Sequence, residues 1–218
     1  MAKVIKKNDT NTLELYPWVF FAQNYFYLAR LACQELLSNR KEKHSKSDTS
    51  NVPYTHDSLF VPILFNVKHG TEVFIKAINV FSYKEYTEGV HDIRQLFTDL
   101  KKKIDKREFN PPTQEFYDSV TQDEIDELPN KLGKIEPLVS FFHYLDLLKT
   151  KVGQNYTIKD VKNDVLRYPD NHADIQIDWN TILITRIGRS DINQILENLN
   201  KLSELFNEVA SVIVRLSR

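Results

Sequence analysis

The segment between Ser58 and Phe81 constrains the fold more than any other part of the chain, because its apolar residues recur at helical spacing. One face carries Phe60, Leu64, Val67, Phe74 and Ile78, and further apolar residues lie elsewhere around the helix. A helix that is apolar nearly all round has to be buried. We therefore expect this helix to lie near the centre of the protein, with other helices packed around it.

Other segments also carry helical patterns. Helices are predicted over residues 13–39, 89–107, 134–149 and 190–218. In the first of these, the recurring apolar residues are Phe20, Tyr27, Leu28, Leu31 and Leu36. Thr121 and Glu124 have the spacing of a capping box, which predicts a separate short helix, and Pro137 suits the first turn of the helix over 134–149. Ser190 or Asp191 is expected to be the N-cap of the last helix.

The composition favours one all-α domain over residues 1–218. The chain contains 5 Gly and 8 Pro, which is few for a turn-rich β protein, and 218 residues are enough for one sizeable core. A small irregular or β insertion is expected between about 152 and 188, because Ile175, Ile177 and Trp179 alternate with polar residues. Residues 40–56 are polar, and we expect them to form a mobile loop.

Charge and cysteine content exclude several classes of protein. The formal net charge of -1 provides no global basic field, so a nucleic-acid site would have to be a local patch. Cys33 is the single cysteine, which excludes an internal disulfide and a cysteine metal cluster, and it is expected to be an inert core thiol. We expect no metal and no cofactor. No apolar run approaches the length of a membrane span, so we expect a cytoplasmic protein without a membrane association.

One polar stripe interrupts the apolar segment between Ser58 and Phe81. Helical spacing places Asn66, His69, Glu72 and Lys76 within roughly 120° of one another. Buried polar groups need partners, so the stripe either contacts another polar patch or lines a binding site. A satisfied hydrogen-bond network between helices is the structural alternative to a binding site.

The start of the next helix supplies two further candidate binding residues, His91 and Arg94. The positive end of the helix dipole favours a neutral imidazole at His91, and a neutral histidine can accept a proton. The structural alternative is that Asp92 simply caps the helix and that His91 has no chemical role.

Arg167 and His172 are the candidate catalytic residues. An arginine can hold a phosphate while a histidine that titrates near neutrality moves a proton, and together they can cleave RNA without a metal. The alternative is a loop arginine that pairs with a carboxylate and an exposed histidine. Pro169 lies between the two residues and breaks the helix that would place them on one face.

Several segments together resemble one family. The segment 68–72, Lys-His-Gly-Thr-Glu, followed by Lys76 and Ala77, resembles the Lys-His-Gly-x-Glu helix of HEPN-like (higher eukaryotes and prokaryotes nucleotide-binding) domain proteins. The segment 91–96 resembles their next helix, and 166–169, Leu-Arg-Tyr-Pro, resembles a segment that some members carry before the final helix. The resemblance covers about residues 58–218.

This resemblance implies an all-α HEPN-like helical bundle that forms a homodimer. The family includes metal-independent endoribonucleases that act as toxins or in phage defence. By resemblance, Arg167 would bind the scissile phosphate and His172 would act as acid or base. Tyr168 and Pro169 depart from the family's nuclease motif, which continues on helical backbone.

Two functions are therefore expected. The first is a HEPN-like protein that acts on or binds RNA or nucleotides, as an endoribonuclease, with an antitoxin or another defence-system protein as its partner. The alternative is a non-catalytic HEPN-like interaction module that binds a partner protein or a nucleotide beside His69 and Glu72. The apolar content of the helices over 58–81 and 190–218 also favours a homodimer, because it exceeds what one small bundle needs to bury.

Overall fold

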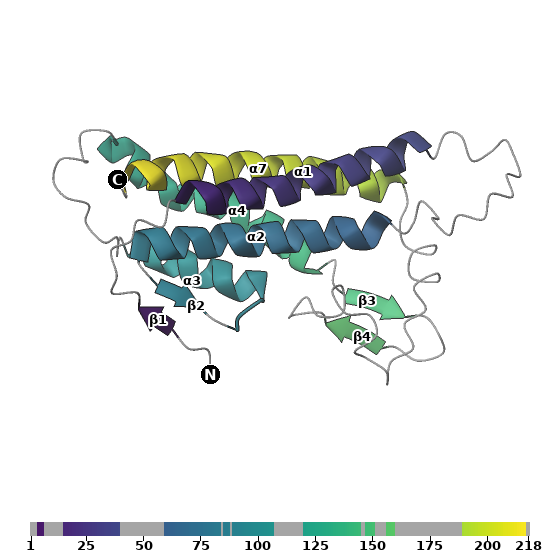
Figure 1. The fold of residues 1–218 in the computed structure, drawn as a ribbon, viewed down its shortest axis with the longest axis horizontal. Helices are drawn as coiled ribbons and strands as arrows, with labels where there is room; N and C mark the ends of the chain where they lie inside the picture. Colours follow the sequence, from purple (N-terminus) through teal and green to yellow (C-terminus); the bar gives the residue numbers. More distant parts are fainter. Residues whose placement is uncertain are drawn as a thin grey trace, which may run out of the picture.

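A computed structural model describes residues 4–6, 15–39, 59–83, 85–87, 89–106, 120–144, 147–150, 156–159 and 189–216. Five helices make up most of this part of the chain: α1 (Leu15–Asn39), α2 (Phe60–Tyr83), α3 (Ile93–Asp105), α4 (Gln122–Tyr144) and α7 (Arg189–Leu216). They pack as an elongated bundle (Figure 1), which confirms the all-α class. Among the described residues, no helix has the length and apolar character needed to cross a membrane.

Two short antiparallel pairs of strands accompany the helices. In the first, β1 (Val4–Lys6) pairs with β2 (Glu85–Thr87), so that the N-terminal strand lies beside the connection between α2 and α3. In the second, β3 (Leu147–Thr150) pairs with β4 (Tyr156–Lys159). Most of the insertion predicted between 152 and 188, including its alternating segment, lies outside the described residues, as do residues 40–56.

The central position predicted for α2 is confirmed. α2 contacts α1, α3, α4 and α7. Figure 1 shows α1 and α7 along one side of α2 and α3 along the other. In the core, the ring of Phe74 from α2 stacks on Phe206 from α7 at a centroid distance of 4.1 Å, and Phe26 from α1 lies 6.1 Å from Phe206. All three rings are fully buried, so these aromatic contacts join three helices around one core.

The predicted extent of α1 is confirmed, but its recurring apolar residues, Phe20, Tyr27, Leu28, Leu31 and Leu36, mostly do not face the core. Of that set only Leu36 is buried, and the other four are exposed. The buried face consists instead of smaller residues with one ring: Ala22, Phe26, Ala29, Cys33 and Leu36. Alanine and cysteine side chains let α1 approach α2 and α7 closely. The interior position of Cys33 raises the pKa of its thiol to about 12, as expected for an inert core thiol.

The two helices predicted around Thr121 and Pro137 form one continuous helix, α4, which corrects the prediction. Pro129 and Pro137 both lie inside it, although proline removes a backbone donor and usually ends a helix. The helix also ends earlier than expected, at Tyr144, because residues 147–150 pair with β4 as strand β3. At its other end the capping box is confirmed: the backbone N–H of Glu124 donates to Oγ1 of Thr121, and the backbone N–H of Thr121 donates to Glu124.

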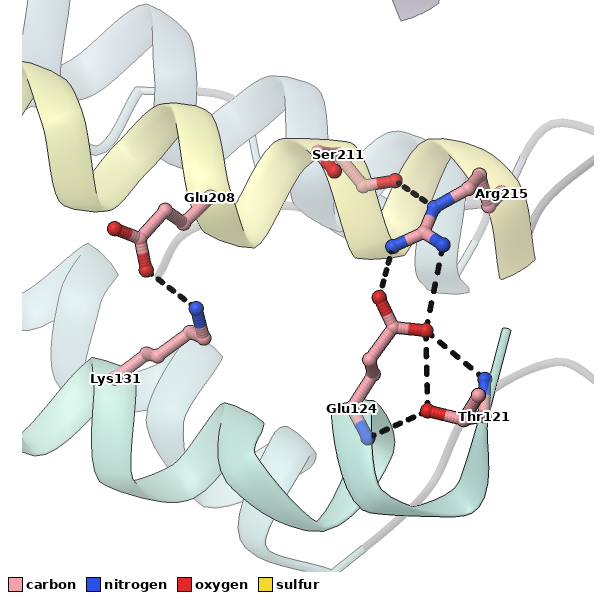
Figure 2. Close-up of polar contacts among 6 residues, drawn as sticks. All are labelled: Thr121, Glu124, Lys131, Glu208, Ser211 and Arg215. Carbon is pink, nitrogen blue, oxygen red and sulfur yellow. Dashed lines mark hydrogen bonds and ion pairs between the residues drawn. The ribbon is translucent and has the colours of Figure 1, made fainter. Parts of the chain in front are cut away.

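Ion pairs join α4 to α7 along their exposed edges (Figure 2). Arg215 donates from Nη2 to Oε1 of Glu124 at 2.6 Å, and Lys131 pairs with Glu208. The Arg215 guanidinium and then the Thr121 backbone hold the pKa of Glu124 at about 2. One carboxylate therefore both caps α4 and pairs with α7.

The last helix begins one residue before the predicted N-cap. α7 starts at Arg189, so that Ser190 and Asp191 lie in its first turn. Among the apolar residues that recur along this helix, Leu205 is partly buried and the others are buried: Ile192, Ile195, Leu199, Leu202, Phe206, Val209 and Ile213.

Candidate functional site

Glu72 lies at the centre of a polar cluster between α2 and the start of α3. Its side chain is 5% exposed, and its Oε1 accepts hydrogen bonds from Nζ of Lys76 at 2.7 Å and from Nδ1 of His91 at 2.9 Å. Lys76 follows one helical turn after Glu72, so helical spacing alone brings this pair together. Because both side chains are nearly buried, each satisfies a charge that would otherwise be costly in the interior.

The second carboxylate oxygen of Glu72 faces His69. Nδ1 of His69 lies 3.9 Å from Oε2 of Glu72, which is too far for a hydrogen bond. The imidazole stacks on Phe65 at 5.5 Å and meets Tyr25 of α1 edge-on at 4.7 Å. These rings hold His69 beside the carboxylate while leaving 21% of its side chain exposed.

The turn that leads into α3 positions His91. Gly89 has φ +73°, a left-handed conformation that favours glycine, and Asp92 is the N-cap of α3. Oδ1 of Asp92 accepts from the backbone N–H groups of Arg94 and Gln95 at 2.9 and 3.1 Å. The cap fixes the chain direction immediately after His91 and so aims its imidazole at Glu72, with 31% of the side chain exposed.

His143, near the end of α4, joins the cluster from a third helix. Its Nε2 lies 3.4 Å from Oδ1 of Asp92, and the residue is 9% exposed. Burial lowers the pKa of His143, and the charges of Lys68 and Arg94 lower it further, against the opposing effect of Asp92. Lys68 and Arg94 are therefore close enough to affect the charge of this imidazole. His143 is accordingly favoured in its neutral form.

Most of the residues predicted for this site come together. His69, Glu72, Lys76 and His91 are in direct or near contact. Arg94 lies in the first turn of α3, close enough to His143 to lower the pKa of that imidazole. Asn66 donates from its Nδ2 to the Pro62 carbonyl one turn back in the same helix, at 2.7 Å. Arg167 and His172 lie outside the described residues.

The sequence reasoning missed His143 and Lys68 as members of the cluster. Lys68 is 3% exposed and directly precedes His69, so its position within the Lys-His-Gly-Thr-Glu segment was an available signal. His143 had no such signal. It lies 51 residues beyond Asp92, and only the packing of α4 against α3 brings the two together.

The cluster combines an oriented histidine with several basic groups. When Glu72 is ionised, Nδ1 of His91 carries the proton, which leaves the other ring nitrogen of the neutral imidazole as an acceptor. This is the relation of a general base to the carboxylate that orients it. Among the described residues, the basic side chains of Lys68, Lys76 and Arg94 belong to this cluster together with the carboxylates of Glu72 and Asp92, and basic side chains of this kind attract an anionic ligand.

Within the described part of the chain, no group of three or more His, Cys, Asp or Glu side chains is arranged to hold a metal ion. The charges of the cluster are instead arranged in pairs, as in the contacts of Glu72 with Lys76 and His91. No protein-family model, curated protein or solved structure matches this chain.

Proposed function

We propose that this protein is a HEPN-like protein that binds RNA or nucleotides through their phosphate groups at the cluster around Glu72. The observation that carries the proposal is the 2.9 Å hydrogen bond between His91 and Glu72, on a half-buried histidine next to basic side chains. A phosphate would be attracted by Lys76 and Arg94 and would accept hydrogen bonds from them. His69 and His91 would strengthen that attraction wherever they are protonated.

The structural alternative for the cluster is a satisfied hydrogen-bond network between helices, and it is compatible with this proposal. The hydrogen bonds of Glu72 do join α2 to α3, as an internal network would. However, a network with a purely structural role has no need for two histidines with 21% and 31% of their side chains exposed. This partial exposure favours a site that a ligand can reach.

RNA binding should be reduced by removal of a basic group at the cluster. We expect Arg94→Ala to weaken binding of a single-stranded RNA oligonucleotide and to lower the slope of log affinity against log salt by about 0.7, the value for one phosphate contact. Fluorescence anisotropy at several salt concentrations measures both quantities. Lys102→Ala is the matched control, because Lys102 is on the same helix with 67% of its side chain exposed. Equal losses in the two variants would contradict a site at the cluster.

The catalytic part of the proposal assigns metal-independent cleavage of RNA to Arg167 and His172, as in toxin and phage-defence ribonucleases. The 2′-oxygen would form a bond to the adjacent phosphorus as the bond from phosphorus to the 5′-oxygen breaks, and the 5′-oxygen would take a proton from water, which leaves a 2′,3′-cyclic phosphate and a 5′-hydroxyl. A histidine would take the proton of the 2′-hydroxyl, and Arg167 would stabilise the charge that develops on the phosphate. The cluster around Glu72 would then hold a neighbouring phosphate of the same strand.

Cleavage should be lost on substitution of either catalytic candidate. We expect Arg167→Ala and His172→Ala each to abolish cleavage of single-stranded RNA in EDTA while the circular dichroism spectrum and the unfolding midpoint stay unchanged. Because a histidine of ordinary pKa titrates near pH 6.5, cleavage by the wild type should vary between about pH 5 and 8. Full activity in either variant would show that the spacing of the two residues has no catalytic meaning.

A non-catalytic interaction module is the second candidate function. It is favoured by the partial exposure of His69 and His91, which would offer a partner protein or a nucleotide a polar surface beside Glu72. A defence-system protein or a neutralising antitoxin would be the partner. RNA binding without any cleavage by the wild type in EDTA would make this the leading proposal.

A further inference from the structure

We propose that α1 forms an antiparallel homodimer through an uncharged apolar stripe on its outer face. The stripe consists of Phe20, Phe21, Tyr27, Leu28 and Leu31, which are between 43% and 62% exposed. Among the described residues, every large apolar side chain that is exposed belongs to α1. The inference is independent of the proposed RNA site.

The stripe lies opposite the face that α1 buries. At about 100° per residue, its five members fall within an arc of roughly 120°, while Ala22, Phe26 and Cys33 lie on the other side of the helix. The buried side packs against α2 and α7 (Figure 1). The helix therefore has two apolar faces, and the described part of the chain covers only one of them.

The area of the stripe suits a specific interface. A side chain of this size has an accessible surface of roughly 200 Å², so the stripe presents about 500 Å² of side-chain surface. A standard protein interface buries about 800 Å² on each partner, including its polar rim. The stripe could thus form the apolar centre of such an interface.

The chemistry of the stripe favours a second copy of this chain as the occupant. Within the span of the stripe, residues 20–31, Arg30 is the only Asp, Glu, Lys or Arg, and in an antiparallel pair the two copies of Arg30 lie toward opposite ends of the interface, away from each other. A lipid-binding helix would instead be rich in lysine and arginine beside its apolar face, whereas Arg30 is the only basic residue within this span. The spacing of Phe20, Asn24, Tyr27 and Leu31 alternates between four and three residues, as in helices that pair along their length.

The distribution of side-chain sizes favours an antiparallel arrangement. The phenylalanines lie at the N-terminal end of the stripe and the leucines at its C-terminal end. In an antiparallel pair, Phe20 of one copy lies near Leu31 of the other, so that large residues pack against smaller ones. Asn24 then lies near Tyr27, where its amide can form a hydrogen bond with the phenol.

A parallel arrangement would be less favourable at both ends. It would crowd the phenylalanines of the two copies together, and it would place Glu35, one turn beyond Leu31, next to the same residue of the other copy. The antiparallel pair separates these two carboxylates to opposite ends of the interface.

The mass in solution tests the dimer. At micromolar concentration, light scattering should give twice the 25.6 kDa of one chain for the wild type and 25.6 kDa for Phe20→Lys/Leu31→Lys. Asn193→Lys/Gln194→Lys on α7 is the matched control, because it adds two charges at exposed positions outside the stripe and should remain dimeric. A monomeric wild type, or a stripe variant that stays dimeric, would overturn the proposal.

Disulfide cross-linking tests the direction of the helices. Under mild oxidation, Phe20→Cys/Leu31→Cys should form a covalent dimer, whereas Phe20→Cys and Leu31→Cys alone should not. In the antiparallel pair, equivalent residues lie about 16 Å apart along the helix axis, from a rise of about 1.5 Å per residue. Cys33 is fully buried, so it should contribute no background. Cross-linking of either single variant would indicate parallel helices and would overturn the arrangement.

Discussion

Replacing Glu72 with alanine is expected to lower the free energy of unfolding by about 3 kcal/mol. The substitution would leave Lys76, which is 7% exposed, without the carboxylate that now lies 2.7 Å from its ammonium group. His91 would lose its hydrogen bond at the same time. Urea unfolding monitored by circular dichroism measures the change.

A matched pair elsewhere in the chain is the control for this prediction. Glu197 and Lys201 of α7 have the same four-residue spacing and a 2.6 Å contact, but both side chains are more than half exposed. Glu197→Ala should leave the urea midpoint almost unchanged. Glu72→Ala/Lys76→Met should recover part of the lost stability, because it removes the buried charge that the single substitution leaves behind. Equal effects of Glu72→Ala and Glu197→Ala would contradict the buried cluster.

The second large effect is expected at Gly70, where α1 and α2 approach each other. A Cβ atom at this position would lie 2.9 Å from Cε1 of Phe26 and 3.1 Å from the backbone oxygen of Ala22. Phe26 is fully buried and the backbone of α1 cannot yield cheaply. Gly70→Ala should therefore lower the free energy of unfolding by roughly 1–2 kcal/mol, despite the better helix propensity of alanine.

Gly133→Ala is the control for this prediction, because it should change the free energy of unfolding in the opposite direction. Gly133 lies inside α4, and a Cβ atom there would meet nothing within 4 Å. Gly133→Ala should raise the free energy of unfolding by about 0.5–1 kcal/mol, because alanine loses less backbone entropy in a helix. Chemical denaturation of the two variants and of the wild type measures both changes in the free energy of unfolding. A stabilising Gly70→Ala would mean that α1 and α2 can separate without cost at this point.

The sequence predicted the helices well where one apolar face dominates, and failed where there are two. In α2, Leu64, Val67, Phe74 and Ile78 of the predicted apolar face are buried, and the single apolar face of α3 is buried as well. α1 carries bulky residues on one face and small residues on the other, and helical spacing cannot tell which face is buried. That choice depends on how closely the neighbouring helices approach, which the structure shows at Gly70.

The structure also places the exposed apolar surface on a different helix from the two expected for the dimer. The apolar residues of α2 and α7 were expected to exceed what the bundle buries. However, the large apolar side chains that the structure describes on these two helices are buried or partly buried within the bundle. The exposed apolar surface is on α1 instead. The homodimer thus remains a proposal, with a different helix at its interface.

The candidate site could be predicted where its residues are close in the sequence. Glu72 and Lys76 lie one helical turn apart and His69 lies three residues before Glu72, so periodicity alone grouped them. His91 was expected as a candidate, but its contact with Glu72 depends on the turn at Gly89 and the cap at Asp92. His143 could not be predicted, because only the packing of α4 brings it to Asp92.

The central claim is that the cluster around Glu72 binds the phosphates of RNA, and histidine NMR tests it most directly. Protein labelled with ¹⁵N-histidine would be titrated with single-stranded 2′-O-methyl RNA, which lacks the attacking hydroxyl and cannot be cleaved by the proposed reaction. We expect saturable shifts of the ring resonances of His69 and His91, assigned by His69→Gln and His91→Gln, and a loss of these shifts in Arg94→Ala. Binding that leaves both resonances unmoved would contradict the account.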